Sequence, residues 1–227
     1  MFDAAALNPG AAMPDPMQLM QEMAAARKGG TGDDLTTALV NAEVDGERLT
    51  AAEMASFFIL LVVAGNETTR NAISHGLVLL EQNPEQRAIW TADFEGVAPT
   101  AVEEIVRFCS PVAYMRRTAT ADTELRGTKI KAGDKLAMFY LSANRDEDHF
   151  VNPHVFDVRR SDNAHLGFGG PGPHFCLGAH LARREITVMF REIFRRLPDI
   201  HVTGEPEYLR SSFIHGIKHL PCAFTAS

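Results

Sequence analysis

The longest helical pattern in the chain opens at Thr50 and can run to about Gln82. It begins with Thr-Ala-Ala-Glu, a capping box in which the side chains of Thr50 and Glu53 would each accept a hydrogen bond from the other residue's backbone N–H. A helix of this length would measure roughly 50 Å at ~1.5 Å per residue. Its first half contains the apolar run 57–64, so we expect this helix to cross the core of the protein.

Shorter elements precede and follow this helix. Capping residues and apolar spacing predict helices over 16–27, from Asp33 or Asp34 to Val40, from Pro84 to about Trp90, from Pro99 to a point before Ser110, and from Cys176 to Arg196. Alternating residues with intervening turns predict a short antiparallel sheet over 118–141. Residues 208–224 predict a hairpin that turns near His215-Gly216. The predicted fold class is therefore mainly α with small β-sheets.

Composition narrows the class of protein. The 227 residues are 45% hydrophobic and 22% charged, as in soluble globular proteins of one large or two small domains. The net charge of −7 argues against a nucleic-acid-binding surface and gives no support for a polybasic membrane patch. Three scattered cysteines are too few for a disulfide framework, the N-terminus lacks a signal-peptide pattern, and no apolar run approaches the ~20 residues that span a bilayer. We expect a cytoplasmic protein without a transmembrane segment.

The segment from Gly167 to Gly178 has the composition of a tightly turning loop, with five glycines and two prolines around Cys176. A helical pattern follows, so the Cys176 sulfur would lie at the positive end of a helix dipole and near free backbone N–H groups, which favour a thiolate. Such a glycine-rich backbone can also lie against a flat group. This combination predicts a metal-binding thiolate at an open face, whereas a lone cysteine after a turn is more commonly a buried structural residue.

The run from Phe168 to Gly178, Phe-Gly-Gly-Pro-Gly-Pro-His-Phe-Cys-Leu-Gly, resembles the haem-ligand loop of cytochromes P450. The aromatic residue stands eight positions before Cys176, and the family's usual seventh position is Gly169 in this chain. This variant is similar to the loop of actinobacterial members that oxidise sterol side chains and methyl-branched lipids. The resemblance implies haem b as the cofactor, with Cys176 as the axial ligand of its iron.

The same resemblance assigns further residues to the cofactor. Phe168, Gly169, Gly170 and Gly178 would form the loop beside the haem, whereas Arg117 and His174 would bind its propionates. An arginine suits this role because the guanidinium can bind a carboxylate through two parallel hydrogen bonds.

A segment in the middle of the long helix, Ala64-Gly65-Asn66-Glu67-Thr68, matches the family's Ala-Gly-x-Asp/Glu-Thr motif. A mid-helix glycine followed by an acid and a hydroxyl indicates a local break in the hydrogen-bond ladder, which can admit water or a ligand. The resemblance implies a catalytic segment that delivers protons through Glu67 and Thr68. The alternatives are close helix packing at Gly65 and a Thr68 hydroxyl bonded to the preceding turn.

Glu104 and Arg107 are three residues apart and therefore share one face of a predicted helix. An exposed pair of this kind contributes little to stability. The resemblance implies instead a buried structural pair that a later arginine completes. The Phe-Asp-x-x-Arg spacing that starts at Phe156 favours Arg160 over Arg159 for that third position.

Contacts with the substrate are implied for apolar residues on three segments, namely Val63, Val112, Ala113, Tyr114, Met115, Phe213 and Ile214. For Phe213 and Ile214, a plain surface hairpin with one apolar face is an equally good interpretation. Several histidines show no metal-ligand spacing and receive no role, namely His75, His149, His154, His201 and His219.

The resemblance extends from Asp33 to the end of the chain. We expect residues 1–32 to be a loosely structured remnant of a missing N-terminal half, and residues 33–227 to be the C-terminal part of a cytochrome P450 domain. The reaction implied for the complete protein is hydroxylation of an unactivated C–H bond in a methyl-branched fatty acid or a sterol side chain. It would use O₂ and electrons from NAD(P)H, delivered by ferredoxin and ferredoxin reductase. The alternatives are a truncated, inactive fragment and a haem-binding protein without turnover.

Overall fold

The computed structural model describes residues 16–225; residues 1–15 and 226–227 lie outside the described part of the chain. The chain divides into two compact units, residues 1–64 and residues 65–227. Helix α4, Ala51–Gln82, runs through the boundary between them. The predicted boundary after residue 32 does not coincide with this division, and residues 1–15 of the predicted remnant lie outside the described residues.

The first unit contains short elements that precede α4. In chain order they are helix α2 (Pro16–Arg27), helix α3 (Leu35–Asn41), strand β1 (Glu43–Val44) and its antiparallel partner β2 (Glu47–Arg48). Asp34 caps α3, because its carboxylate accepts a hydrogen bond from the backbone N–H of Thr37 at 3.0 Å. Ala24, Val40 and Ala55 are buried together as a small core. Both helices predicted in this region are confirmed, and Asp34 is the capping residue.

Helix α4 begins with the predicted capping box. The Glu53 N–H donates to the Thr50 hydroxyl at 3.2 Å, and the Thr50 N–H donates to the Glu53 carboxylate at 2.8 Å. The helix is continuous from Ala51 to Gln82, so the predicted break at Gly65 is wrong. A single glycine costs only about 1 kcal/mol inside a helix, which the good helix formers on both sides can offset.

The two halves of α4 differ in burial. Large apolar side chains before the middle of the helix are exposed, namely Ile59, Leu60, Val62 and Val63. The second half is buried in the second unit, where Leu80 has no exposed surface. The expectation that the whole helix crosses a core therefore holds for its second half only. By length and composition alone, α4 could also cross a membrane, but this is weak evidence because core helices meet the same criterion.

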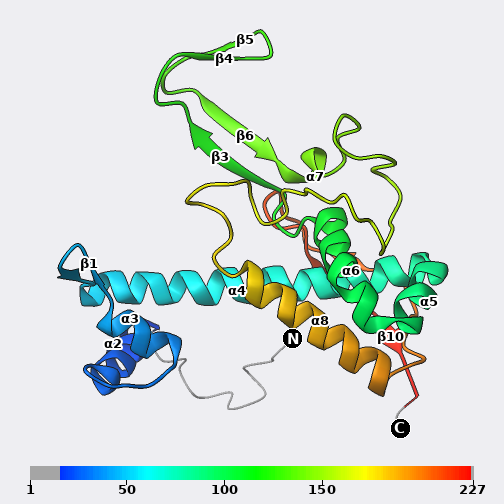
Figure 1. Ribbon diagram of the computed structural model, residues 1–227, viewed down its shortest axis with the longest axis horizontal. Helices are drawn as coiled ribbons and strands as arrows, with labels where there is room; N and C mark the ends of the chain where they lie inside the picture. The colour runs from blue at the N-terminus through cyan, green and yellow to red at the C-terminus, as the bar shows by residue number, and fades with distance from the viewer. Residues whose placement is uncertain (1–15, 226–227) are drawn as a thin grey trace. The chain divides into compact units, whose positions relative to one another are not determined.

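Three further helices form the core of the second unit with the end of α4. They are α5 (Pro84–Ala92), α6 (Phe94–Cys109) and α8 (Ala179–Arg196). Figure 1 shows α6 and α8 side by side, and the core includes the fully buried side chains of Trp90, Ile105 and Phe190. The ring centroids of Trp90 and Phe190 lie 4.9 Å apart. Burial of such side chains supplies most of the stability of this unit, at about 1.5–3 kcal/mol for each large apolar group.

Helix α6 begins at Phe94, earlier than the predicted start at Pro99. Asp93 caps it, because its carboxylate accepts a hydrogen bond from the Gly96 N–H at 3.1 Å. Pro99 lies inside the helix, where it removes one backbone hydrogen bond. Burial of Val97 on the preceding turn favours the helix despite that loss. The prediction was wrong because it took the proline as the first helical residue.

The predicted antiparallel sheet is present as two strand pairs along one ribbon, seen in Figure 1 above α6. Strand β3 (Tyr114–Thr118) pairs with β6 (Lys135–Phe139), and β4 (Thr123–Leu125) pairs with β5 (Thr128–Ile130). Arg126 and Gly127 connect β4 to β5 with positive φ angles of 47° and 81°. The ribbon ends at Phe139, and the next residues form the short helix α7 (Tyr140–Ala143).

The predicted C-terminal hairpin is only partly correct. Strand β8 (Glu207–Tyr208) pairs with β9 (Ile217–His219), but β10 (Cys222–Ala223) pairs with β7 (His201–Val202), the strand that follows α8. Gly216 lies at the base of the 209–216 loop, because its carbonyl accepts a hydrogen bond from the Leu209 N–H at 2.8 Å. The turn is therefore not at His215-Gly216, since the His215 N–H donates to the Pro111 carbonyl instead.

Candidate functional site

The loop that carries Cys176 is fastened by backbone hydrogen bonds. The Cys176 N–H donates to the Phe168 carbonyl at 2.9 Å, and the Ala179 N–H that starts α8 donates to the Cys176 carbonyl at 3.2 Å. Gly169 turns the chain with a φ of 87°, a conformation that side chains disfavour. Cys176 itself is exposed. The loop therefore presents a thiol at a solvent-accessible face, as the sequence predicts, but the helix begins at Ala179, three residues after the predicted start at Cys176.

Phe168, near the start of this loop, has a buried side chain. The Arg183 guanidinium from α8 lies 4.4 Å from the centroid of its ring, and the His165 ring lies 5.7 Å from it. Glu103 of α6 fixes both partners, because its carboxylate accepts hydrogen bonds from Arg183 at 2.6 and 2.9 Å and from His165 Nε2 at 3.1 Å. Burial alone would raise the pKa of Glu103, but the hydrogen bonds from Arg183 and His165 outweigh it and lower the pKa to about 2.

The sequence did not reveal the cluster of Glu103, His165 and Arg183. Glu103 and Arg183 are 80 residues apart, and neither lies at a spacing that marks a site. The available signal was limited to two acidic residues of α6, Glu95 and Glu103, each of which pairs with an arginine of α8. Because a guanidinium over an aromatic ring is attracted by its electron-rich face, the cluster holds Phe168 in place.

A cavity of about 420 Å³ lies beside the Cys176 loop, between the loop and the end of the β3–β6 ribbon. Its lining includes Arg117 of β3, His174 of the loop, and the backbone of Gly169 and Gly170. The structure thus brings together the two side chains that the sequence assigned to the haem propionates. A guanidinium and an imidazole at one cavity suit carboxylates, and an exposed sulfur suits iron. This donor set fits haem.

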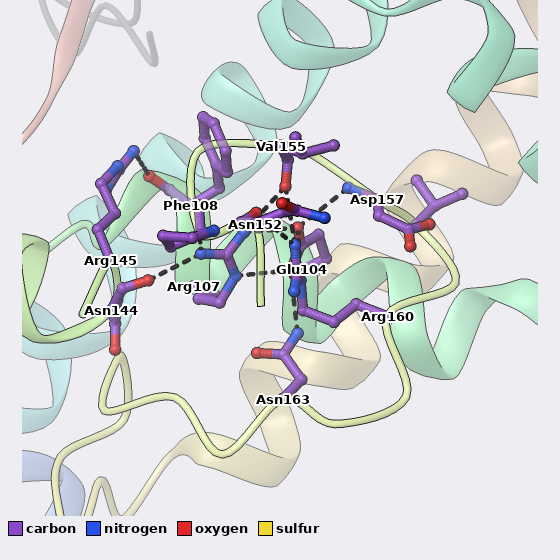
Figure 2. A network of polar contacts seen from close by, with 12 residues as sticks. Glu104, Arg107, Phe108, Asn144, Arg145, Asn152, Val155, Asp157, Arg160 and Asn163 are labelled. Atoms are coloured by element: carbon purple, nitrogen blue, oxygen red, sulfur yellow. Dashed lines mark hydrogen bonds and ion pairs between the residues drawn. The ribbon is translucent and has the colours of Figure 1, made fainter. Parts of the chain in front are cut away.

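A buried charge network lies beneath the loop, shown in Figure 2. The side chains of Glu104 and Arg107 are both fully inaccessible to solvent and are joined by two hydrogen bonds of 2.7 Å. Arg160 Nε donates to both Glu104 oxygens at 3.1 and 3.2 Å. The predicted trio is therefore brought together, and Arg160 rather than the exposed Arg159 is its third member.

Two asparagines that the sequence did not single out complete this network. Asn163 donates to the Glu104 carboxylate at 3.1 Å. The Asn144 carbonyl accepts a hydrogen bond from Arg107 at 2.7 Å, while its side-chain oxygen accepts one from the Leu166 N–H at 2.7 Å (Figure 2 shows the Asn144–Arg107 contact). Asn144 therefore connects the buried ion pair directly to the start of the Cys176 loop.

The predicted catalytic segment lies across the boundary between the two units. Val63 and Ala64 end the first unit, whereas Gly65, Glu67 and Thr68 begin the second. Glu67 is about half exposed and forms an ion pair with Arg70 at 2.6 Å. No atom of another part of the described chain lies within 4 Å of where a Cβ at Gly65 would be, so close packing does not account for this glycine.

Most of the residues predicted to contact substrate meet at the start of β3. The Ala113 N–H donates to the Phe213 carbonyl at 2.8 Å, and Val112 forms an isolated antiparallel bridge with Ile214. The ring centroids of Tyr114 and Phe213 are 6.2 Å apart. The neighbouring Met115 lies opposite Met138 in the ribbon. Gly178 has a structural position, since it is the residue that caps α8.

Comparisons with known proteins point to one family. The family model of cytochrome P450 matches residues 97–203. The chain is 63% identical over 203 residues to a methyl-branched lipid omega-hydroxylase of Mycobacterium tuberculosis (strain ATCC 25618 / H37Rv), covering 89% of this chain and 47% of the relative. It is 47% identical over 212 residues to a steroid C26-monooxygenase of Rhodococcus jostii, covering 93% of this chain and 44% of that relative.

Solved structures give the same result for the fold. A Mycobacterium marinum cytochrome P450 in complex with pseudoionone superposes with a TM-score of 0.87 at 53% identity, over 92% of this chain and 50% of that one. A Bacillus megaterium protein solved with testosterone superposes with a TM-score of 0.88 at 34% identity, over 93% of this chain and 59% of that one. The chain spans about half the length of the curated relatives it matches.

Proposed function

We propose that this chain, which is similar in sequence and fold to cytochromes P450 over about half of their length, supplies the haem-thiolate side of a monooxygenase active site. The observation that carries this proposal is the cavity lined by Arg117, His174 and the glycine-rich loop that leads to the exposed Cys176. Cys176 would hold the haem iron, and Arg117 and His174 would hold the propionates. When bound, haem would supply the activation of O₂ and the oxygenation of a C–H bond.

The buried network gives Cys176 a fixed position. The Asn144 side-chain oxygen accepts a hydrogen bond from the Leu166 N–H at one end of the loop, and the Phe168 carbonyl accepts one from the Cys176 N–H at the other. Asn144 is itself held because its backbone carbonyl accepts a hydrogen bond from Arg107. A thiolate on a preorganised loop can meet the iron without reordering the chain. Glu104, Arg107 and Arg160 therefore act as positioning residues in this proposal.

Proton delivery is proposed for Glu67 and Thr68 of α4. Glu67 is about half exposed, so its carboxylate can exchange protons with solvent. Thr68 is the next residue of the helix, and its hydroxyl can pass a proton inward by donating one and accepting another. The open space at Gly65 would leave room for water beside these groups.

The proposed substrate is the terminal methyl group of a methyl-branched fatty acid or of a sterol side chain. The support is the apolar surface formed by Val112, Tyr114, Phe213 and Ile214, together with the activities named for the two relatives. Ala113 and Met115 of the same unit would add to this surface. Electrons from NAD(P)H would arrive through ferredoxin and ferredoxin reductase, and we place the protein in the cytoplasm.

A second candidate is a non-catalytic or inactive chain. The exposed apolar side chains of Leu60, Val62 and Val63 favour it, because such a surface on the first half of α4 is normally covered in a folded enzyme. A haem-binding protein without turnover would not need the Glu67-Thr68 pair, which argues for the monooxygenase.

The test uses a fusion in which the N-terminal half of the Mycobacterium tuberculosis relative precedes this chain; we call it the joined protein. After haem loading, reduction and CO addition, we expect the long-wavelength absorption band of a thiolate-ligated haem. Cys176→Ser should abolish the band, because a hydroxyl is a far poorer ligand than a thiolate. Cys109→Ser is the matched control, since Cys109 is buried in α6. A band that survives in Cys176→Ser and disappears in Cys109→Ser would refute the assignment.

A further inference from the structure

His215 lies where four parts of the second unit meet. Its backbone N–H donates to the Pro111 carbonyl at 2.9 Å, just before β3. Its ring Nδ1 is 2.6 Å from the carbonyl oxygen of Cys109 at the end of α6. Its own carbonyl oxygen is 3.1 Å from Nε2 of His75 in α4. Its ring also stacks on Tyr208 of β8, with centroids 6.2 Å apart.

These contacts identify the donor nitrogen of each imidazole. A carbonyl oxygen only accepts hydrogen bonds, so the proton of His215 lies on Nδ1 and that of His75 lies on Nε2. The two rings are tilted against each other with centroids 4.3 Å apart, and His75 is buried. Both rings therefore donate a hydrogen bond to a backbone carbonyl and pack against each other.

Neighbouring residues of α4 hold the strand that follows His215. Asn71, one helical turn before His75 and fully buried, accepts a hydrogen bond from the Ile217 N–H at 3.1 Å. Arg70 donates to the Ile217 carbonyl at 3.1 Å. A Cβ at Gly216 would lie 3.1 Å from the Asn71 side chain, so only glycine fits this approach without displacement.

We propose that His215 is a positioning residue for the substrate pocket: it locks the 209–216 loop onto the segment that leads from α6 into β3. The loop carries Phe213 and Ile214, and the segment carries Val112 and Ala113. With α4 as the fixed base, His215 holds these two directly bridged segments in one position. Their apolar surface would then accept a branched lipid terminus in one orientation; this last step rests on the proposed function.

The first test needs no cofactor. Hydrogen–deuterium exchange is measured on the 227-residue chain at micromolar concentration, for wild type, His215→Ala and His215→Asn. Asparagine keeps an N–H donor close to the position of Nδ1 but loses the ring. We expect His215→Ala to exchange about tenfold faster in peptides covering 209–217 and 110–116, with His215→Asn much closer to wild type. Peptides from 97–107 should not change.

A second pair of variants covers the case in which His215→Ala unfolds the whole unit. His75→Leu removes the donor to the His215 carbonyl, whereas His75→Gln keeps an N–H near the position of Nε2. Faster exchange of 209–217 in His75→Leu but not in His75→Gln would support the anchor. Unchanged exchange of both loop segments in His215→Ala, or in His75→Leu if His215→Ala is unfolded, would overturn it.

The effect on substrate is measured in the haem-loaded joined protein. We expect His215→Ala to weaken binding of a methyl-branched fatty acid about tenfold, with the CO spectrum unchanged and with recovery in His215→Asn. Equal affinity in His215→Ala and wild type would refute the positioning role even if the loop is loosened. A wild-type joined protein without the thiolate band would refute the proposed function, while the exchange experiment would still decide whether His215 anchors the loop.

Discussion

Glu104 and Arg107 face each other through two parallel hydrogen bonds of 2.7 Å, and neither side chain has any surface exposed to solvent. Pairs at this helical spacing are normally solvated and weak. Here the pair lies under the irregular segment between α7 and the Cys176 loop, and Arg107 also donates to the backbone carbonyls of Asn144 and Pro153. The pair therefore holds the irregular segment after α7 in place through hydrogen bonds to its backbone.

Removing one member of this pair should destabilise the chain strongly. Glu104→Ala leaves the buried Arg107 and the partly buried Arg160 without their carboxylate. Arg107→Ala removes the fully buried cation from the Glu104 carboxylate, which then keeps Arg160 and Asn163. We expect a loss of roughly 3–5 kcal/mol in the free energy of unfolding for either variant, measured by urea denaturation. The matched control is Glu192→Ala, which removes an exposed pair with Arg195 at the same spacing. Similar midpoints for Glu104→Ala and Glu192→Ala would contradict the prediction.

Thr68→Ala in the joined protein should leave haem binding intact but reduce the product formed per NAD(P)H consumed. The physical reason is that oxygen activation needs protons at the right moment, and a hydroxyl beside Glu67 can pass them. The missing reducing equivalents should appear as hydrogen peroxide. Thr68→Ser, which keeps the hydroxyl, is the matched control and should restore most of the coupling. Wild-type coupling in Thr68→Ala would mean that Thr68 only satisfies its own helix.

The buried His75 should make stability fall in mild acid. Burial, and then the neighbouring His215, lower the pKa of His75 to about 4 from an ordinary 6.5. Between these values the unfolded chain binds a proton that the folded chain excludes, so the stabilisation is complete above pH 6.5 and is lost as the pH falls toward 4. The total effect is about 3 kcal/mol. His75→Gln should show a shallower decline between pH 7 and pH 4.5 in urea denaturation, whereas parallel curves would contradict the assignment.

The features that could be predicted from sequence are the local ones. Asp34 at the start of α3, Thr50 with Glu53 at the start of α4, and the glycines around Cys176 act through atoms a few residues away, so spacing alone reveals them. The role of Pro99 was misjudged because a tertiary gain outweighed its local cost: Val97 and Ala98, directly before it, are buried in the core.

Features that join distant parts of the chain could not be predicted. Strand β10 pairs with β7, and its sequence gives no preference for that partner over β8. The Glu103–Arg183 pair and the contacts of His215 depend on how α4, α6 and α8 pack, which no spacing encodes. His75 is an example of this limit. It belongs to no sequence motif, but its ring forms a hydrogen bond with the carbonyl of His215, 140 positions away.

The last prediction concerns the exposed apolar surface on α4, defined by Ile59, Leu60, Val62 and Val63. Leu60 and Val63 are 60% and 66% exposed, so each lacks much of the burial that is worth about 1.5–3 kcal/mol for a large apolar side chain. Against a typical domain stability of about 5–15 kcal/mol, this surface is a substantial deficit and should drive self-association. We expect the chain alone to bind a hydrophobic dye, to sediment as oligomers and to hold haem poorly.

Two variants test whether the α4 surface, and not exposed apolar residues in general, causes the dye binding and self-association. Leu60→Lys with Val63→Gln should reduce dye binding and self-association of the chain several-fold, because charge and polarity interrupt the continuous apolar surface. Val151→Gln, at an 81% exposed valine on a loop, should change neither. In the joined protein the double substitution should be harmful instead of helpful. We expect little dye binding without the substitutions, because the added N-terminal half covers α4. The two substitutions should then lower the free energy of unfolding, because they place polar groups in that covered surface. Equal dye binding by the chain alone with and without the double substitution would show that the first half of α4 is not the surface responsible.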